Sequence, residues 1–243
     1  MSGHPLNNIL FLDIETVPQH ASYNELSPEW QELWTRKANF LLRDKQTETP
    51  EMIYSNAGIY AEFGKIICIS CGIISKSQEE KKLLIKSFYG DEEKLLLQQF
   101  CETVSKWSHG SEKFLCAHNG KEFDFPYLCR RLVINQIAIP HLLDTSGKKK
   151  WEVSHLDTME LWKFGDYKSY TSLNLLAQVL GIPTPKDDID GSMVNAVYWQ
   201  NRDLLRIVQY CQKDVITVAQ VYLRLTGDCP IKPENIDIKP PGP

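Results

Sequence analysis

The sequence lacks the features that mark membrane and secreted proteins. It contains no run of about 18 apolar residues, the length that a helix needs to cross a bilayer, so no membrane segment is predicted. Residues 1–8 contain no basic segment followed by an apolar stretch, so no secretory leader is predicted either. These absences lead us to expect a soluble, cytoplasmic protein without a membrane partner.

An excess of basic residues and a disulfide framework are missing too. The 27 Lys and Arg residues are outnumbered by 31 Asp and Glu residues, so any contact with nucleic acid must be local. Seven cysteines, an odd number scattered through apolar segments, favour a reducing compartment. Cys68 and Cys71 lie three apart in a strand-like run without a second C-x-x-C pair, so we predict core residues on opposite faces and no zinc site.

The pattern of apolar residues predicts an α/β fold with a mixed β-sheet flanked by helices. Strand-like runs precede and interleave with helical ones, and the last helices cluster near the end of the chain. We expect a single domain over residues 1–229, with a helical insertion at about 17–62. Five prolines in residues 230–243 predict a tail without a regular element. The expected strands cover 8–16, 66–74, 82–89, 113–117 and 156–158, and the expected helices begin at Ser27, Asp91 and Pro126 and cover 172–180, 192–200 and 202–225.

The first strand ends in two carboxylates. Four apolar residues precede Asp13 and Glu15, and because side chains alternate along a strand, both acids point to the same side. Two carboxylates held together repel each other unless a cation lies between them, and a divalent ion is the natural candidate. The alternative is a strand that ends in ordinary surface acids.

Two later segments could supply partners. Asp124 follows a strand and an Asn-Gly turn, and Pro126 predicts the first turn of a helix, where a carboxylate also stabilises the helix dipole. Tyr210 and Asp214 are four residues apart on one face of the last long helix. Its apolar positions Leu205, Val208, Val215 and Val218 suggest that Asp214 borders the core. A carboxylate at the edge of a core needs a partner, which a metal ion would provide.

Together these three stretches resemble the three exonuclease motifs of the ribonuclease-H-like 3′-to-5′ exonucleases. The tyrosine four residues before the last aspartate matches the tyrosine-type (DEDDy) subgroup, since the histidine-type subgroup has His where Gln209 stands. Residues 186–191, with Tyr198 and residues 210–215, are similar to a predicted exonuclease family related to the proofreading domain of B-family DNA polymerases. The resemblance covers residues 8–225 and implies a ribonuclease-H-like fold. The insertion departs from the compact family core.

The resemblance implies hydrolysis of phosphodiester bonds at single-stranded 3′ ends with two divalent ions, Mg²⁺ or Mn²⁺. Asp13 would bridge both ions, Glu15 and Asp214 would complete the first, and Asp124 would hold the second. Tyr210 is a poor base at neutral pH, because a phenol has a pKa near 10, and would instead orient the attacking water. The products would be nucleoside 5′-monophosphates.

Residues beside the acids are expected to contact the substrate. Asn119 would hydrogen bond to the terminal nucleotide, Phe123 would stack or wedge against it, and the backbone of Thr16 would contact its sugar. A core position is the alternative for Phe123. Basic residues at 148–150, 163 and 168 either bind phosphates or form a solvated surface. A structural role is favoured for His118, and Asp188 and Asp190 either bind a ligand or cap a helix.

Two other functions compete with the exonuclease. An aspartyl phosphatase would use Asp13 as nucleophile, but it expects Asp where Glu15 stands and leaves Tyr210 and Asp214 unexplained. A non-catalytic nucleic-acid-binding or protein-docking module would be signalled by loss of an acid, and none is lost. The motifs do not decide between DNA and RNA, although DNA is favoured, and they do not identify a polymerase or DNA-repair partner.

Overall fold

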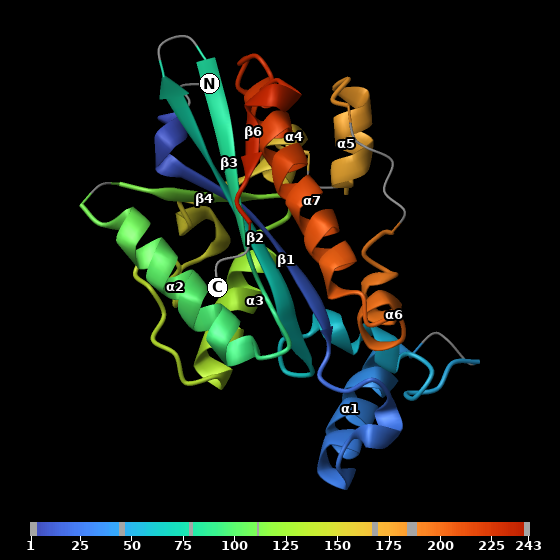
Figure 1. The fold of residues 1–243 in the computed structure, drawn as a ribbon. Helices are drawn as coiled ribbons and strands as arrows, with labels where there is room; N and C mark the ends of the chain where they lie inside the picture. The colour runs from blue at the N-terminus through green and yellow to red at the C-terminus, as the bar shows by residue number, and fades with distance from the viewer. Residues whose placement is uncertain are drawn as a thin grey trace.

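The computed structural model describes residues 4–43, 47–77, 80–110, 112–166, 170–183 and 189–240. A mixed six-stranded sheet lies between helices that cover both of its faces (Figure 1). Strand β2 pairs antiparallel with both β1 and β3, whereas β4 pairs in parallel with β1 and β5, and β6 in parallel with β3. This confirms the predicted α/β class and mixed sheet. Across the sheet the order is β5 (Leu156–Asp157), β4 (Phe114–Ala117), β1 (Ile9–Pro18), β2 (Gly64–Ser77), β3 (Glu80–Tyr89) and β6 (Ile236–Ile238).

Strand β1 is central and buried on both faces. Leu10, Leu12 and Ile14 pack in the cluster beneath α2 (Glu93–Ser108) and α3 (Asp124–Ile134). Ile9 and Phe11 point the other way, toward buried residues of α7 (Leu204–Leu225). Since side chains alternate along a strand, Asp13 and Glu15 continue the row of Ile9 and Phe11 and face α7.

The remaining helices gather around α7 (Figure 1). They are α4 (Thr158–Lys163), α5 (Leu173–Val179) and α6 (Val194–Trp199), and each contacts α7. Helices α5, α6 and α7 confirm the three predicted near the end of the chain, whereas α4 was not predicted. In the part of the chain that the structure describes, no helix is long and apolar enough to cross a membrane.

The segment between β1 and β2, residues 19–63, forms a small unit with its own core. It contains α1 (Pro28–Leu41), drawn in blue at the lower right of Figure 1, and two short 3₁₀ turns, Tyr23–Glu25 and Tyr54–Ile59. Trp34 is fully buried at its centre, and the Trp34 indole N–H donates to the Pro50 carbonyl over 2.8 Å. Ser27 precedes α1 as predicted, but its hydroxyl donates to the Glu29 carboxylate and gives no side-chain cap.

The prediction that residues 230–243 hold no regular element is wrong. A 3₁₀ turn at Pro233–Asn235 leads into β6, which pairs in parallel with β3. Residues 234–239 contain no proline, so their backbone N–H groups are free to extend the sheet. The Gln220 side chain anchors the segment, because it donates to the Ile231 carbonyl and accepts from the Ile231 N–H. The boundary between domain and tail at residue 229 stays a prediction.

Two predictions within helices are also wrong. Helix α2 begins at Glu93, and Asp91 accepts a hydrogen bond from the Tyr198 hydroxyl over 2.6 Å instead of capping the helix. Leu205 was expected to border the core but is exposed, and Leu95 on α2 is exposed as well. Each sits beside the buried row of its helix, outside the stripe that the sheet covers.

The predicted core role of the C-x-x-C cysteines is confirmed. Cys68 packs with Val208 and Cys211 on the α7 face of the sheet. Cys71 belongs to the cluster on the opposite face. The two thiols therefore cannot share a metal ion across the sheet.

Candidate active site

The candidate site begins on β1, where Asp13 and Glu15 face α7. Glu15 is buried, and although Asp13 is partly exposed, its Oδ2 is shut off from solvent and has no hydrogen-bond partner in the described part of the chain. The pairing of β1 with β2 shifts register between Glu15 and Thr16. Such a bulge disrupts the ladder and re-aims the backbone beside the two acids.

Helix α7 brings a second group of side chains to the same place. The Cys211 thiol donates to the backbone carbonyl of Asp13 over 3.4 Å, which ties α7 to β1. One donor atom each of Asp13, Glu15 and Cys211 lie within 4.8 Å of one another. Tyr210 and Asp214 interact, as their i, i+4 spacing on one face of α7 allows.

The turn after β4 places Asp124 at the N-terminus of α3. Asn119 adopts a left-handed conformation with φ of 63°, and a side chain at Gly120 would put its Cβ 2.4 Å from the Cβ of Ala117. The buried carboxylate of Asp157 accepts hydrogen bonds from the backbone N–H groups of Asn119 at 2.9 Å and Lys121 at 3.2 Å. Asp157 therefore holds the strained turn in place from the neighbouring strand β5.

The carboxyl groups of these elements interact strongly. Burial raises the pKa of Asp13 well above its usual range, and the charges of Glu15, Asp214 and Asp124 raise it further. Burial and Asp214 do the same to the pKa of Glu15. Burial raises the pKa of Asp124 to about 7. The metal-free site thus resists holding all of its negative charges at once.

Two neighbours of the acids stay neutral. Burial, followed by the charge of Asp214, raises the pKa of the Tyr210 phenol above its ordinary value, so this hydroxyl keeps its proton at neutral pH. Burial likewise raises the pKa of the Cys211 thiol. The charged ligands that remain are carboxylate oxygens, which hard divalent cations prefer.

The residues fit a bound cation. In the described part of the chain, no ion pair includes Asp13, Glu15 or Asp124. Buried carboxylates without a positive partner are costly, and the unpartnered Oδ2 of Asp13 lies among them. A divalent cation would relieve the repulsion and satisfy this oxygen. The arrangement is therefore a possible metal centre.

Comparison with known proteins supports this assignment. A family model described as a predicted 3′-5′ exonuclease related to the exonuclease domain of PolB matches residues 59–228. The chain belongs to this exonuclease family. The match covers Asp124, Tyr210 and Asp214, whereas Asp13, Glu15 and most of the insertion precede it. A search of curated proteins finds no match. The family implies nuclease activity on a nucleic-acid substrate.

Three residues were predicted to contact the substrate of this exonuclease-family protein, and each lies close to one of the acids in the sequence. They are Thr16, Asn119 and Phe123. The Thr16 side chain interacts with the phenol of Tyr127. Phe123 is half-buried and packs against Tyr127 with ring centroids 5.3 Å apart, so it belongs partly to the core. The Oδ1 of Asn119 is buried and has no hydrogen-bond partner within the described residues. Asn119 thus offers an unused acceptor next to Asp124.

The basic and polar residues near the motifs have mostly structural contacts. Lys150 forms ion pairs with Glu122 and Glu160, so its charge is largely compensated. His118 interacts through both ring nitrogens, with the Thr158 hydroxyl and the Thr171 carbonyl, each over 2.8 Å, as its predicted structural role requires.

Other polar candidates take no part in the acidic group. The Lys149 ammonium lies over the Trp151 ring. Asp190 accepts from both the backbone N–H and the hydroxyl of Ser192, which makes it a turn-stabilising residue. Lys168 and Asp188 lie outside the described residues.

Sequence reasoning gave no role to Asp157 and Cys211 in this exonuclease-family site. Asp157 was predicted to lie on a short edge strand, where an acid is common without any special role. It also caps helix α4, which was not predicted. Cys211 follows Tyr210 directly in the third motif. Its place on the buried face of α7 was the available signal, since Val208 and Val215 flank it at helical spacing.

Proposed function

We propose that this protein is a metal-dependent 3′-to-5′ exonuclease that shortens single-stranded nucleic acid and releases nucleoside 5′-monophosphates. The observation that carries the proposal is the group of mutually repelling carboxylates on β1, α3 and α7, in which Asp13 Oδ2 has no hydrogen-bond partner among the described residues. A structural role would not need this much negative charge in one place. Divalent cations that in turn bind a substrate phosphate would need it.

Asp13, Glu15, Asp124 and Asp214 would hold two divalent ions, with Asp13 shared between them. When bound, these ions would neutralise charge on the phosphate and lower the pKa of the attacking water. Mg²⁺ or Mn²⁺ fits an all-oxygen ligand set better than zinc. In the reaction, water attacks the terminal phosphorus, the bond from phosphorus to the 3′ oxygen of the preceding nucleotide breaks, and that oxygen takes up a proton.

The chain's own residues would orient the reactants. Tyr210 stays a neutral phenol, so it can position water by hydrogen bonding but cannot remove its proton. The bulge after Glu15 frees the backbone of Thr16 to contact the terminal sugar. Asn119 offers to the terminal nucleotide its Oδ1, which has no hydrogen-bond partner in the described segments, and the half-buried Phe123 offers a ring for stacking.

The test uses 5′-labelled single-stranded DNA and RNA of the same sequence with Mg²⁺ or Mn²⁺. We expect a ladder of products shortened from the 3′ end, release of mononucleotides, and no reaction in a chelator. Protein that binds both strands but cleaves neither under any metal condition would support the non-catalytic module instead. DNA is the favoured substrate. A polymerase or repair partner and a cytoplasmic location stay predictions.

A further inference from the structure

The inserted unit exposes aromatic rings and a cation beside the end of β1. Trp30 on α1 is 40% exposed, and its ring centroid lies 5.8 Å from that of Phe63. The ammonium of Lys37 lies 4.4 Å from the centroid of the Tyr60 ring. Trp30 and Lys37 are seven residues apart and so share one face of α1. We call Trp30, Lys37, Tyr60 and Phe63 the insertion platform.

The platform is fixed to the strand that carries the acids. The backbone N–H of Gln19, four residues beyond Glu15, donates to the Phe63 carbonyl over 3.0 Å. Gly58 packs so closely on β1 that a Cβ there would lie 2.9 Å from the carbonyl carbon of Val17. The Tyr127 hydroxyl, which also contacts Thr16, donates to the Gly58 carbonyl over 2.7 Å. The inserted unit is therefore held rigidly against the site.

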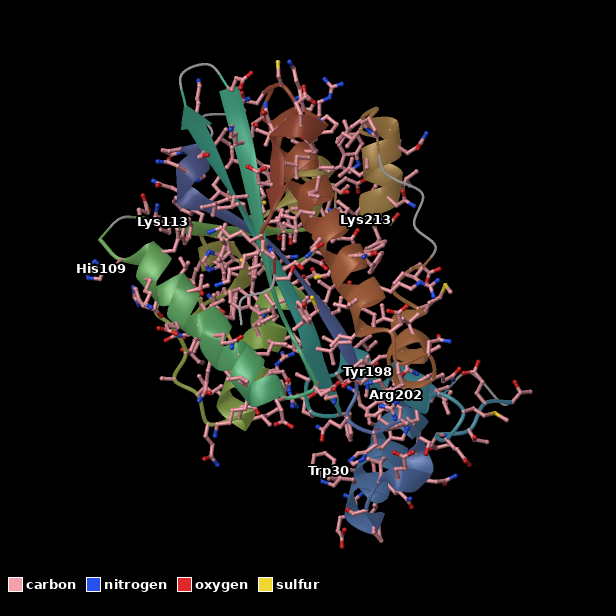
Figure 2. All side chains as sticks on the ribbon, in the orientation of Figure 1. Trp30, His109, Lys113, Tyr198, Arg202 and Lys213 are labelled. Carbon is pink, nitrogen blue, oxygen red and sulfur yellow. The ribbon has the colours of Figure 1, made fainter. Side chains whose placement is uncertain are left out.

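The distance from the acids suits a strand that leaves the site. Four residues of extended chain span about 13 Å, so Phe63 lies roughly that far from Glu15 along β1. Stacked bases rise about 3.4 Å each, so this corresponds to about four nucleotides. Figure 2 shows Trp30 projecting from α1 at the same end of the molecule as Tyr198 and Arg202.

The pattern of cations beside aromatic rings continues on α6. Lys65, two residues after Phe63, has its ammonium 5.0 Å from the Trp199 ring centroid. The guanidinium of Arg202 lies 5.4 Å from the same centroid. On α1, the acidic Glu32 is neutralised by its ion pair with Arg36. Cations interleaved with rings suit a single strand, because bases stack on the rings and phosphates meet the charges.

We propose that the insertion platform binds the single strand several nucleotides behind its 3′ end. This inference rests on the proposed exonuclease function and deepens it. Trp30 and Phe63 supply the stacking surface, and Lys37 supplies a phosphate contact. The insertion would thereby favour longer strands without touching the scissile bond.

Four proteins test the platform: wild type, Trp30→Ala, Lys37→Gln and the control Phe40→Ala. Phe40 is also exposed on α1, and its ring lies beside the Arg43 guanidinium, with 4.4 Å between the ring centroid and Arg43 Cζ. For Trp30→Ala we expect about tenfold weaker binding of a labelled dodecanucleotide and a similar rise in its KM, with kcat unchanged. For Lys37→Gln we expect a salt-dependence slope smaller by about 0.7. Phe40→Ala should match wild type, and kcat/KM for a dinucleotide should be the same in all four.

The outcomes separate the platform from the reaction. If both platform variants bind the dodecanucleotide as wild type does, the proposal is wrong. The exposed surface would then be explained better as a protein-binding site. If Trp30→Ala lowers dinucleotide and dodecanucleotide turnover equally, the effect comes from a disturbed site and the proposal also fails. If the wild type cleaves nothing, the proposed function fails, and the binding measurement still decides whether the platform holds a strand.

Discussion

The acids on the two faces of the sheet have very different surroundings. On the α2 and α3 face, Glu93 accepts hydrogen bonds from the Ile66 N–H at 2.8 Å, the Asn135 amide at 2.9 Å and two nitrogens of the Arg131 guanidinium. Arg131 in turn donates to the Ala61 carbonyl over 2.7 Å. Every charge there has a partner from the chain itself.

On the α7 face the carboxylates lie near one another. The pKa values of Asp13 and Glu15 are raised by burial and by neighbouring negative charge, and Asp13 Oδ2 has no partner within the described residues. Within the described residues, the chain thus supplies a full set of hydrogen-bond partners to the buried carboxylate of Glu93 but not to the carboxylate of Asp13. The contrast supports the proposal that Asp13 and Glu15 bind a cation, whereas Glu93 and Arg131 stabilise the fold and anchor the insertion through Ala61.

The largest expected effect comes from Asp13→Asn. The amide keeps the shape of the side chain but cannot hold cations as a carboxylate does, so activity should fall about 10³-fold or more. Removal of one charge relieves repulsion, so the melting temperature of the metal-free protein should not fall. Nuclease assays and thermal unfolding check both parts, with the exposed-acid variant Glu102→Gln as control. A large loss of stability would show that this group is structural after all.

Arg131→Met should mainly affect stability. It leaves Glu93 buried without its cation, which costs about 3 to 5 kcal/mol in the free energy of unfolding. Adding Glu93→Gln should recover part of the loss, since the amide oxygen can still accept from Ile66. Urea unfolding measures these changes. Lys106→Met, which breaks an exposed ion pair on α2, the helix of Glu93, should cost less than about 1 kcal/mol. Equal losses for the two variants would contradict the comparison.

A pH titration of stability probes another buried ionisable side chain, His155, whose two ring nitrogens both have partners within the chain. His155 accepts from the Leu115 N–H and interacts with the Leu142 carbonyl, and burial lowers its pKa to about 4. Between about pH 6.5 and 4 the unfolded chain binds a proton that the folded chain excludes. Stability should therefore be complete above pH 6.5 and fall by up to about 3 kcal/mol as the pH drops to 4.

The variant His155→Phe isolates this contribution. Its stability at neutral pH should be lower, but the part of the pH dependence between 6.5 and 4 that comes from His155 should disappear. His141→Gln, at an exposed histidine, should keep the wild-type profile. An unchanged slope in His155→Phe would mean that other groups govern acid sensitivity.

The smallest expected effect is stabilisation by the cation itself. Mg²⁺ or Mn²⁺ at about 100 times its dissociation constant should raise the free energy of unfolding by about 2.7 kcal/mol. Arg131→Met should gain as much as wild type, because its lesion lies on the other face, whereas Asp13→Asn should lose most of the gain. Scanning fluorimetry with and without a chelator measures this. A gain that disappears in Arg131→Met but not in Asp13→Asn would reverse the assignment of the two groups.

The sequence by itself determined which residues of one strand or helix share a face, because this depends only on local periodicity. Alternation along β1 placed Asp13 and Glu15 on one side, and helical spacing placed Tyr210 beside Asp214. The same rule put Cys68 and Cys71 on opposite faces of the sheet. These predictions succeeded because a strand or helix sets which of its own residues share a face, whatever it packs against.

Only the tertiary structure decided which faces meet. The local sequence does not show that Glu93 contacts Arg131, which lies 38 residues away. Nor does it show that Asp13 lies near Asp124 and Asp214, which come from distant segments. Asp157 gains its role from a turn on the neighbouring strand, and β6 exists because β3 offers it an open edge. Leu95 and Leu205 are exposed because the sheet covers only one stripe of each helix. Contacts between distant segments depend on the packed arrangement of the whole chain, which no short stretch of sequence encodes.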